Sequence, residues 1–421
     1  MSRSLRGRIS LPGDKSISHR AVLLSSISEG KCRIRNLATG RDLQSTVKAV
    51  KQLGVEVTEP APDDLDISGI GMNNFVQPKT PLDCGNAGTS LRLLLGLIAG
   101  SNISATLDGD KSLRRRPVNR VAMPLRQMGA SIELTDRGTC PATVAGKPLN
   151  GIGYALPVAS AQVKSAILLA ALSAEGETEI LEPTPTRDHT ERMLISLGVP
   201  LTTSDCMVST GPAKSIPAFE LDVPGDISSA AFVVSAAILL PGSDIVIENV
   251  CLNRTRCGYL QILRRMGADI STDEVEIKRG EAVGKLFVKS SGLHSSRCDD
   301  IPIATFIDEV SVLALAATQA EGVTRLSNLG ELRVKESDRL SGILSILAAA
   351  GAKIHIEGDD LVIYGPTRLF PPKVDTQNDH RLAMTVETIN IICEGEFDGS
   401  YSDELSISFP EYYDVMKSLL G

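Results

Sequence analysis

A cationic segment near the start of the chain is the first part of the sequence whose residue types and order could do chemistry. Residues 11–20, LPGDKSISHR, place Lys15, Ser16 and Arg20 between a short apolar segment ending at Gly13 and the apolar run AVLLSSI. This order predicts a strand, a turn and the first turn of a helix. Helix N-termini carry unsatisfied N–H groups and a positive dipole end, and added Lys and Arg side chains strengthen them as anion sites. We therefore expect this segment to bind a negatively charged ligand.

Polar and charged residues also gather where the other helices are expected to begin. Such positions hold Gly85–Thr89 with Arg92, Ser160 to Gln162 with Lys164, Asp308 with Glu309, and Asp379 to Arg381. A second set holds Arg41-Asp42, Arg114–Arg116, Arg187–His189, Arg254 with Arg256, and residues 335–339, KESDR. Several helix starts facing one cleft would hold a ligand that has phosphate and carboxylate groups.

Simple helix capping is the competing explanation for these clusters. Asp14 suits an N-cap position, and Asp308 with its neighbour could be acids that only complement a helix dipole. Capping does not explain Lys15, because a cation opposes the dipole at a helix N-terminus. The same objection favours a functional role for Arg116 and Arg381.

Spacing excludes several named motifs. Asp14 stands where a phosphate-binding P-loop has its second Gly, and GNAGTS departs from the dinucleotide-binding pattern. Ser160 and Lys164 are one residue too far apart for an S-x-x-K motif. The five His residues show no metal-ligand spacing. We therefore expect no metal.

Composition narrows the class of protein. The 421 residues are enough for two domains, and a net charge of −8 with 3% aromatic residues argues against binding to nucleic acid or an anionic membrane. Eight dispersed Cys residues without a C-x-x-C pair indicate free thiols in a reducing compartment. No apolar run is long enough to span a membrane or resembles a secretory signal. We expect a cytoplasmic protein, and a monomer.

Six apolar helical runs end in Gly, and each precedes a β-like segment. The glycines are 66 to 80 residues apart: Gly30, Gly100, Gly176, Gly242, Gly322 and Gly395. A second expected helix in most units also ends at a Gly, which suits a left-handed helix cap. The spacing predicts six copies of a helix–strand–helix–strand unit.

A repeated Pro-Gly-Asp sequence divides these six units into two sets of three. It occurs at residues 12–14 and again at residues 224–226. We expect the chain to cross between two lobes near 12–14 and 224–227. One lobe would comprise residues 1–13 and 227–421, and the other residues 14–226.

Eight ordered motifs in this chain resemble those of the 5-enolpyruvylshikimate-3-phosphate (EPSP) synthase family. They are DKSISHR, GNAGTSLR, SLRRRP, SAQVKSAILLA, TRDHTERM, FIDEVSVLALAA, LRVKESDRL and NDHRLAM. The resemblance spans nearly the whole chain. It implies an α/β (α+β) fold, a two-lobed inside-out α/β barrel in which each lobe has three βαβαββ units around a pseudo-threefold axis.

The resemblance also implies a reaction. Shikimate 3-phosphate and phosphoenolpyruvate would be joined through a tetrahedral adduct, and phosphate would be released. Asp308 would accept the proton of the 5-hydroxyl group, and Glu336 would exchange the proton at the methylene carbon with help from Lys15. Positioned acid/base groups and cations that neutralise the phosphate and carboxylate groups are what this chemistry needs.

The same resemblance assigns the binding residues. Shikimate 3-phosphate would be held by Lys15, Ser16, Arg20, Ser160, Ala161, Gln162, Arg187, Asp308 and Lys335. Phosphoenolpyruvate would be held by Lys15, Gly88, Arg116, Gln162, Arg339 and Arg381. A Cβ at Gly88 is expected to project into this site.

Two positions depart from the family pattern. Ile407-Ser408 stand where many relatives have a Lys before Phe-Pro, which leaves one phosphoenolpyruvate contact in question. Ala161 replaces the second Ser of a Ser-Ser-Gln motif, as in one bacterial branch, and Arg187 would supply the missing phosphate contact. Gly88 leaves room for glyphosate, a mimic of phosphoenolpyruvate, so inhibition is expected.

Two other functions remain possible at this stage. A sister enolpyruvyl transferase acts on UDP-N-acetylglucosamine, but it typically has Lys-Asn where this chain has Lys15-Ser16, and a Cys near residues 112–116, where this chain has none. A non-catalytic two-lobed anion-binding protein is the other alternative. The presence of Asp308 and Glu336 argues against it.

Overall fold

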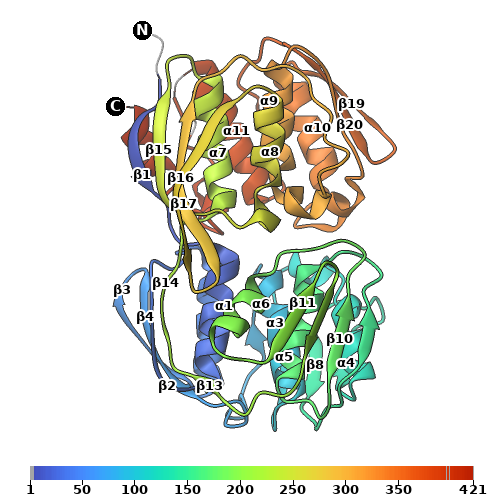
Figure 1. Ribbon diagram of the computed structural model, residues 1–421. Coiled ribbons are helices and arrows are strands. Elements are labelled where there is room, and N and C mark those ends of the chain that lie inside the picture. Colours follow the sequence, from blue (N-terminus) through green and yellow to red (C-terminus); the bar gives the residue numbers. More distant parts are fainter. Residues whose placement is uncertain (1–3, 395, 398, 421) are drawn as a thin grey trace. The chain divides into compact units, whose positions relative to one another are not determined.

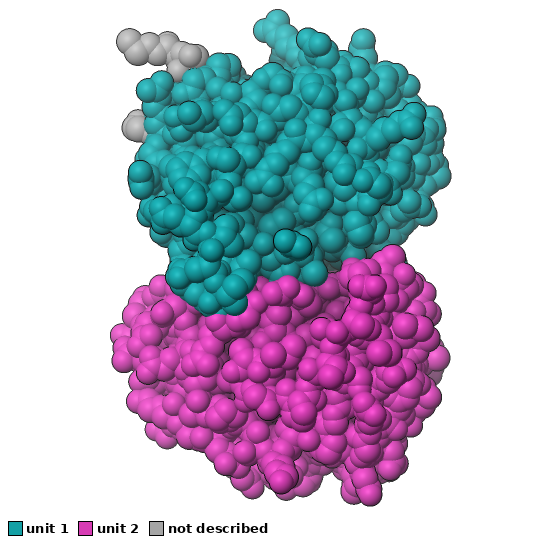
Figure 2. All heavy atoms as spheres, in the orientation of Figure 1, with its two compact units in different colours: residues 1–12, 224–278, 282–421 teal, residues 13–223, 279–281 magenta. Residues whose placement is uncertain are grey.

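The chain forms two compact units. The computed structural model describes residues 4–394, 396–397 and 399–420. Unit 1 comprises Met1–Pro12, Pro224–Lys278 and Ala282–Gly421, and unit 2 comprises Gly13–Val223 and Arg279–Glu281 (Figure 2). Each unit has its own buried core and is described by itself.

Three helices that are buried on nearly every side form the core of unit 2. They are α1 (Lys15–Ser26), α3 (Gly88–Ala99) and α5 (Ala161–Ala171), and α3 packs against both of the others. Helices that are hydrophobic all round must be covered on all sides. The covering helices α2 (Arg41–Gln52), α4 (Asn119–Gln127) and α6 (His189–Ser196) are buried on one side only.

The strands of unit 2 form three sheets among the described residues (Figure 1). The first has the order β13-β2-β4-β3, with β14 also on β2; the second β5-β6-β8-β7; the third β11-β12-β10-β9. Their bounds are β2 (Ser28–Arg35), β3 (Glu56–Ala61), β4 (Asp64–Ile70), β5 (Leu82–Asp83), β6 (Ser104–Asp108), β7 (Ser131–Glu133), β8 (Ala142–Ala145), β9 (Gly153–Ala155), β10 (Thr178–Leu181), β11 (Leu201–Ser204), β12 (Met207–Thr210), β13 (Ile216–Pro217) and β14 (Glu220–Asp222).

Unit 1 repeats this arrangement. Its buried helices α7 (Ile227–Leu239), α9 (Val310–Gln319) and α11 (His380–Glu394) contact one another, and α8 (Gly258–Arg265) and α10 (Arg339–Ala349) lie outside them (Figure 1). The sheets have the orders β1-β15-β17-β16 and β18-β20-β19. Their bounds are β1 (Arg6–Ser10), β15 (Asp244–Cys251), β16 (Asp269–Lys278), β17 (Glu281–Lys289), β18 (Gly322–Leu326), β19 (Lys353–Glu357) and β20 (Asp360–Gly365).

One strand order recurs in four of the sheets that the described residues form. In each, the strand that follows a core helix has two neighbours. It pairs in parallel with an edge strand on one side and antiparallel with one strand of a hairpin on the other, as β6 does with β5 and β8. All six expected core helices are present, and the predicted mixed α/β class is confirmed. The sheets are open at both edges, so the expected barrel does not close as a continuous sheet.

The prediction of a β-like segment after the sixth apolar helix is wrong for the described residues. Gly395 lies outside them, and the chain that follows forms α12 (Ser402–Leu405) and α13 (Tyr412–Leu420). Tyr412, Met416 and Leu419 are buried at spacings of four and three residues, which is the period of a helix with one apolar side.

The glycine caps are also distributed differently from the prediction. The glycines that end the second helices have φ between 82° and 109°: Gly54, Gly129, Gly198, Gly267 and Gly351. After the core helices, Gly176 and Gly242 have φ of 88° and 80°, and Gly30 and Gly322 lie in β2 and β18 with φ of 113° and 104°. Gly100 instead has a φ of −93°. A Cβ at Gly100 would lie 1.9 Å from Ser173 Oγ, so close packing explains that glycine.

The turn between β16 and β17 belongs to unit 2, although both strands lie mainly in unit 1. Glu281 Oε1 lies 2.7 Å from Nδ1 of His189 in α6, and both side chains are buried. Arg192 donates to the main-chain oxygen of Gly280. The hairpin turn therefore packs on the start of α6.

All eight cysteines are free, five of them buried and three partly buried. None of the helices in the described part of the chain has the length and apolar character needed to cross a bilayer.

Unit 2 contains a buried ion triplet. Lys164 Nζ lies 2.8 Å from Glu182 Oε2 and 2.6 Å from Glu191 Oε1, and all three side chains are at most 4% exposed. Burial raises the pKa of Glu191, and the charge of Lys164 opposes that shift. The triplet joins α5 to α6.

Replacing Lys164 by Met is expected to destabilise the protein by about 3–5 kcal/mol, because two buried carboxylates lose their cation. The pKa of Glu191 then rises further, so the folded state binds a proton that the unfolded state lacks. The loss of unfolding free energy, measured by chemical denaturation, should therefore be smaller at about pH 5 than at about pH 8. Lys51→Met, which removes an exposed pair with Glu59, is the matched control and should change stability little. Equal losses at both pH values would contradict the argument.

Candidate active site

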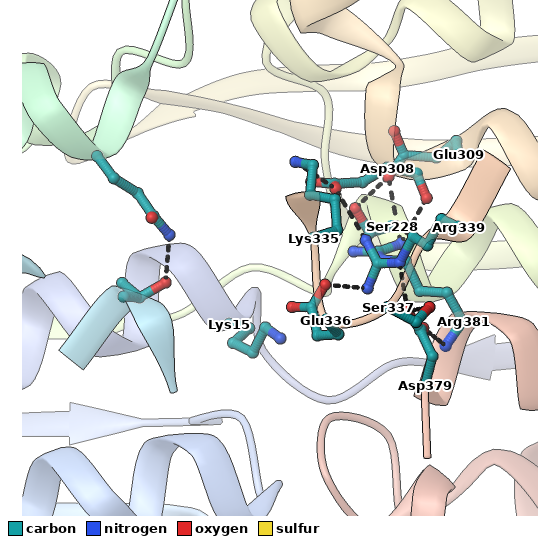
Figure 3. A network of polar contacts seen from close by, with 12 residues as sticks. Lys15, Ser228, Asp308, Glu309, Lys335, Glu336, Ser337, Arg339, Asp379 and Arg381 are labelled. Carbon is teal, nitrogen blue, oxygen red and sulfur yellow. Dashed lines mark hydrogen bonds and ion pairs between the residues drawn. The ribbon is translucent and has the colours of Figure 1, made fainter. Parts of the chain in front are cut away.

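The guanidinium group of Arg339, the first residue of α10, lies among three carboxylates of unit 1 (Figure 3). Its Nε lies 2.7 Å from Asp379 Oδ2, its Nη2 2.5 Å from Glu336 Oε2, and its Nη1 3.4 Å from Asp308 Oδ1. The Arg339 residue is 3% exposed. Burial acts to lower its pKa, and the charges of Asp379, Glu336 and Asp308 together raise it above the usual range. The cation therefore stays charged and fixes three acids around itself.

Two further cations of unit 1 approach Asp308. Lys335 Nζ lies 3.3 Å from Asp308 Oδ1, and Arg381 Nη1 donates to the main-chain oxygen of Asp308 over 2.9 Å. Asp308 lies in the 3₁₀ helix η4 (Ile307–Glu309), Lys335 directly follows η5 (Gly330–Val334), and Arg381 lies in the first turn of α11. The segments before three helices thus bring the predicted acid/base residues and cations of unit 1 together.

Lys15 and Asp14 open α1 in unit 2. Asp14 is the N-cap residue, because its side chain accepts a hydrogen bond from the Ile17 N–H over 2.9 Å. The capping interpretation of Asp14 is therefore correct. Lys15 Nζ lies 3.0 Å from Asp42 Oδ2, beside the start of α2. This ion pair holds the ammonium group at the surface of the helix start.

Arg20 connects three helix starts in unit 2. Its Nε donates to Thr190 Oγ1 and its Nη2 to Ser165 Oγ, both over 2.7 Å, and its Nη1 donates to the main-chain oxygen of Ser16. Thr190 and Ser165 are themselves 2.7 Å apart through their hydroxyl oxygens. These acceptors are uncharged, in contrast with the carboxylates around Arg339.

A second group in unit 2 surrounds the start of α3. Gln162 donates to Thr89 Oγ1 over 2.9 Å and accepts from Arg92 Nη1 over 2.5 Å. Arg116 Nη2 donates to the side-chain oxygen of Asn86 over 2.6 Å. Both guanidinium groups are therefore held by amide oxygens.

Gly88 lies beside the same two arginines. A Cβ at this position would lie 2.8 Å from Arg92 Nη1 and 3.1 Å from Arg116 Nη1. The Cβ that is expected to project into the site would therefore meet these two guanidinium groups first. Those groups are the flexible ends of long side chains.

The remaining predicted residues occupy helix starts of unit 2. Ser160 is the N-cap of α5 and accepts from the Val163 N–H, and Ala161 is the first residue of that helix. Arg187 is partly buried in the segment before α6. Unit 2 thus holds Lys15, Ser16, Arg20, Gly88, Arg116, Ser160, Ala161, Gln162 and Arg187, and unit 1 holds Asp308, Lys335, Glu336, Arg339 and Arg381.

His19 has a structural role. Its Nδ1 lies 2.7 Å from Thr46 Oγ1, and it is fully buried. Burial, together with the charges of Lys15 and Arg20, lowers its pKa to about 3. The ring is uncharged at neutral pH, so it contributes no positive charge to the anion site.

Several residues with a place in these clusters were not assigned from the sequence. Asp379 is completely buried between Arg339 and the main chain of Arg381, and Thr190 holds Arg20. Both lie inside the quoted motifs NDHRLAM and TRDHTERM, which is the signal that could have found them. No group of three or more His, Cys, Asp and Glu side chains in the described residues is arranged to hold a metal ion.

The fold defines the class of protein. A solved EPSP synthase from Acinetobacter baumannii superposes with a TM-score of 0.86 at 36% identity, covering 100% of this chain and 96% of that chain. The enolpyruvyl transferase NikO from Streptomyces tendae has the same fold, with a TM-score of 0.75 at 16% identity, over 99% of this chain and 95% of its own. The fold is therefore that of the enolpyruvyl transferases.

Sequence comparison identifies the family. Residues 1–416 match the family described as EPSP synthase (3-phosphoshikimate 1-carboxyvinyltransferase). A 3-phosphoshikimate 1-carboxyvinyltransferase from Bacillus licheniformis is 42% identical over 418 residues, covering 99% of this chain and 97% of that protein. One from Thermodesulfovibrio yellowstonii is 41% identical over 421 residues, covering 99% and 98%. The chain belongs to the EPSP synthase family, and the resemblance seen in its motifs is confirmed.

Replacing Gly88 by Ala is expected to displace the Arg92 and Arg116 guanidinium groups without disturbing the fold, because only side-chain ends must move. Calorimetry should show weaker binding of phosphoenolpyruvate, by about tenfold, with an unchanged melting temperature. Gly153→Ala is the matched control, since a Cβ there meets nothing within 4 Å. Unaltered binding in Gly88→Ala would mean that the two arginines do not hold the anion.

Proposed function

We propose that the protein transfers the enolpyruvyl group of phosphoenolpyruvate to the 5-hydroxyl of shikimate 3-phosphate and releases phosphate. This is the reaction of the shikimate pathway that the family name describes. The geometric observation that carries the proposal is the pair of carboxylates, Asp308 and Glu336, held on the buried guanidinium group of Arg339. The family comparison favours this reaction over transfer to UDP-N-acetylglucosamine.

The proposed chemistry uses the two carboxylates as separate acid/base groups. Asp308 accepts the 5-hydroxyl proton while the oxygen attacks the central carbon of phosphoenolpyruvate. The methylene carbon gains a proton from Glu336, with Lys15 contributing, and a tetrahedral adduct forms. A methyl proton then returns to the protein as the carbon–oxygen bond to phosphate breaks. Positioned acids and bases of this kind contribute about 10²–10⁴-fold to a rate.

The charges support a division of labour between the two units. In unit 2, the guanidinium groups of Arg20, Arg92 and Arg116 donate to hydroxyl, amide and carbonyl oxygens, and these cations lie close to helix starts, which attract phosphate and carboxylate groups. In unit 1, Arg339 is surrounded by three acids. We propose that unit 2 supplies most of the anion binding and unit 1 the proton transfer.

We propose that the two units act as the lobes of one enzyme, with hinges near residues 12–14 and 224–227. The lobes would be residues 1–13 and 227–421, and residues 14–226. A support is that the predicted functional residues are divided between the units, which the chain connects at Pro12–Gly13, at Val223–Pro224 and at both ends of the Arg279–Glu281 turn. Substrate-driven closure of such lobes excludes water from the reaction.

The proposed ligand contacts follow the family motifs. Shikimate 3-phosphate would contact Lys15, Ser16, Arg20, Ser160, Ala161, Gln162, Arg187, Asp308 and Lys335. Phosphoenolpyruvate would contact Lys15, Gly88, Arg116, Gln162, Arg339 and Arg381. A monomer acting in the cytoplasm without a cofactor is part of the same proposal, and the eight free cysteines suit a reducing compartment.

The decisive experiment measures phosphate release from phosphoenolpyruvate. Release should require shikimate 3-phosphate and should not occur with UDP-N-acetylglucosamine. Replacing Glu336 by Gln should lower kcat by about 10²–10⁴-fold while the circular dichroism spectrum and melting temperature stay normal. Glu331→Gln, at an exposed acid five residues earlier, is the control and should retain the parent rate. Binding of shikimate 3-phosphate without any phosphate release would instead support a non-catalytic binding protein.

Glyphosate is expected to inhibit the enzyme in competition with phosphoenolpyruvate. Gly88 lacks a side chain beside Arg92 and Arg116, so the anion can approach both guanidinium groups. Initial rates at several concentrations of both compounds should give an apparent KM for phosphoenolpyruvate that rises with glyphosate, at an unchanged kcat. Turnover that glyphosate leaves unaltered at low phosphoenolpyruvate would contradict this expectation.

A further inference from the structure

Glu309 has a buried carboxylate that the proposed reaction does not use. Its side chain is completely buried in unit 1, beside Asp308 in the chain. Its Oε1 accepts a hydrogen bond from Ser228 Oγ and lies 3.7 Å from Arg381 Nη1. Its Oε2 is buried without a hydrogen-bond partner among the described residues. Burying an ionised carboxylate is costly, so flanking cations and donors must compensate for it.

Ser228 links this carboxylate to a second buried cation. The Ser228 hydroxyl donates to Glu309 and accepts a hydrogen bond from Arg256 Nη2. Arg256 lies in the 3₁₀ helix η2 (Arg254–Arg256) and is 3.7 Å from Asp226 Oδ1. These contacts form one continuous series of polar side chains that runs from Arg256 through Ser228 and Glu309 to Arg381. Figure 3 shows Ser228, Glu309 and Arg381.

The series starts where the chain enters unit 1. Ser228 lies in the first turn of α7, and its N–H donates to the N-cap residue Asp226 over 2.7 Å. The Asp226 N–H donates to the main-chain oxygen of Pro12 over 3.0 Å, so the crossings at Pro12–Gly13 and Val223–Pro224 are joined near this helix start. Val223 and Gly13, the residues next to the crossings, belong to unit 2.

The series ends at the proposed acid/base group. Arg381 Nη1 is shared between Glu309 Oε1 and the main-chain oxygen of Asp308, which it reaches over 2.9 Å. Because Asp308 and Glu309 are neighbours in the chain, one guanidinium nitrogen of Arg381 contacts both the main chain of Asp308 and the side chain of Glu309. The negative charge of Glu309 fixes the Arg381 guanidinium group in this position.

We propose that Glu309 is a positioning residue, which acts through Arg381 and Asp308 and is itself held by Ser228. It contacts neither substrate in this proposal. Its role is to set the orientation of the Arg381 guanidinium group for phosphoenolpyruvate and of Asp308 for the 5-hydroxyl. The inference rests on the proposed function, because those two ligands define what is being oriented.

The test compares full-length variants with the parent enzyme. Glu309→Gln and Ser228→Ala should each lower kcat/KM for phosphoenolpyruvate by about tenfold or more, since each removes a buried contact to a charged group. The dissociation constant for shikimate 3-phosphate, measured by calorimetry, should stay within about twofold, because most of its proposed contacts lie in unit 2. Equal weakening of both ligands in a folded variant would overturn the proposal.

Two further variants make the test specific. Ser228→Thr retains the hydroxyl and should recover most of the activity lost in Ser228→Ala. Ser235→Ala is the matched control, because Ser235 is buried in the same helix α7 and its hydroxyl has no hydrogen-bond partner among the described residues. Equal losses in Ser228→Ala and Ser235→Ala would overturn the proposal. If Glu309→Gln does not fold, the three serine variants decide the question.

A double variant tests whether the two residues act as one series. Glu309→Gln with Ser228→Ala should lose little more than the more damaging single change, because contacts in one series are not additive. Fully additive losses would overturn the proposed connection. A parent enzyme that releases no phosphate with shikimate 3-phosphate would refute the proposed function, whereas an active parent with unimpaired Glu309→Gln refutes only the positioning role.

Discussion

The burial of one cation determines how unit 1 is built around its functional residues. Arg339 cannot be left without partners in a protein interior, and Asp308, Glu336 and Asp379 surround it from three directions. Each acid begins or precedes a different element, so satisfying the guanidinium group also fixes the starts of α9, α10 and α11 relative to one another. The geometry of the proposed acid/base pair thus follows from an electrostatic requirement of folding.

The two units hold the cations of their proposed functional sites in different ways. In unit 2, the arginines of the proposed anion site donate to hydroxyl, amide and main-chain oxygens, which orient their guanidinium groups. Asp42 pairs with Lys15 at the start of α1, and a separate buried triplet joins Lys164 to Glu182 and Glu191. In unit 1, the buried Arg339 guanidinium group holds the two carboxylates of the proposed acid/base pair, and those carboxylates suit proton transfer.

The sequence predicted the parts of this structure that depend on local order. The apolar runs gave the core helices, and the eight motifs identified the residues at their starts. It could not predict that Arg339 joins Asp308 and Asp379, which are 31 and 40 residues away in the chain. Nor could it separate a strand from a short helix after α11, since a brief apolar pattern fits both periods. The hairpin turn at Arg279–Glu281 had no signal either, because its place depends on tertiary packing against α6.

That turn has a consequence for any attempt to produce one half of the protein alone. A fragment spanning only residues 13–223 would contain the full run of unit 2 except for three residues supplied from far downstream. Without them, the buried imidazole of His189 would lose its Glu281 partner, and Arg192 would lose the carbonyl of Gly280. A stable excised half would need the tripeptide grafted back, so the molecule is less divisible than its two cores suggest.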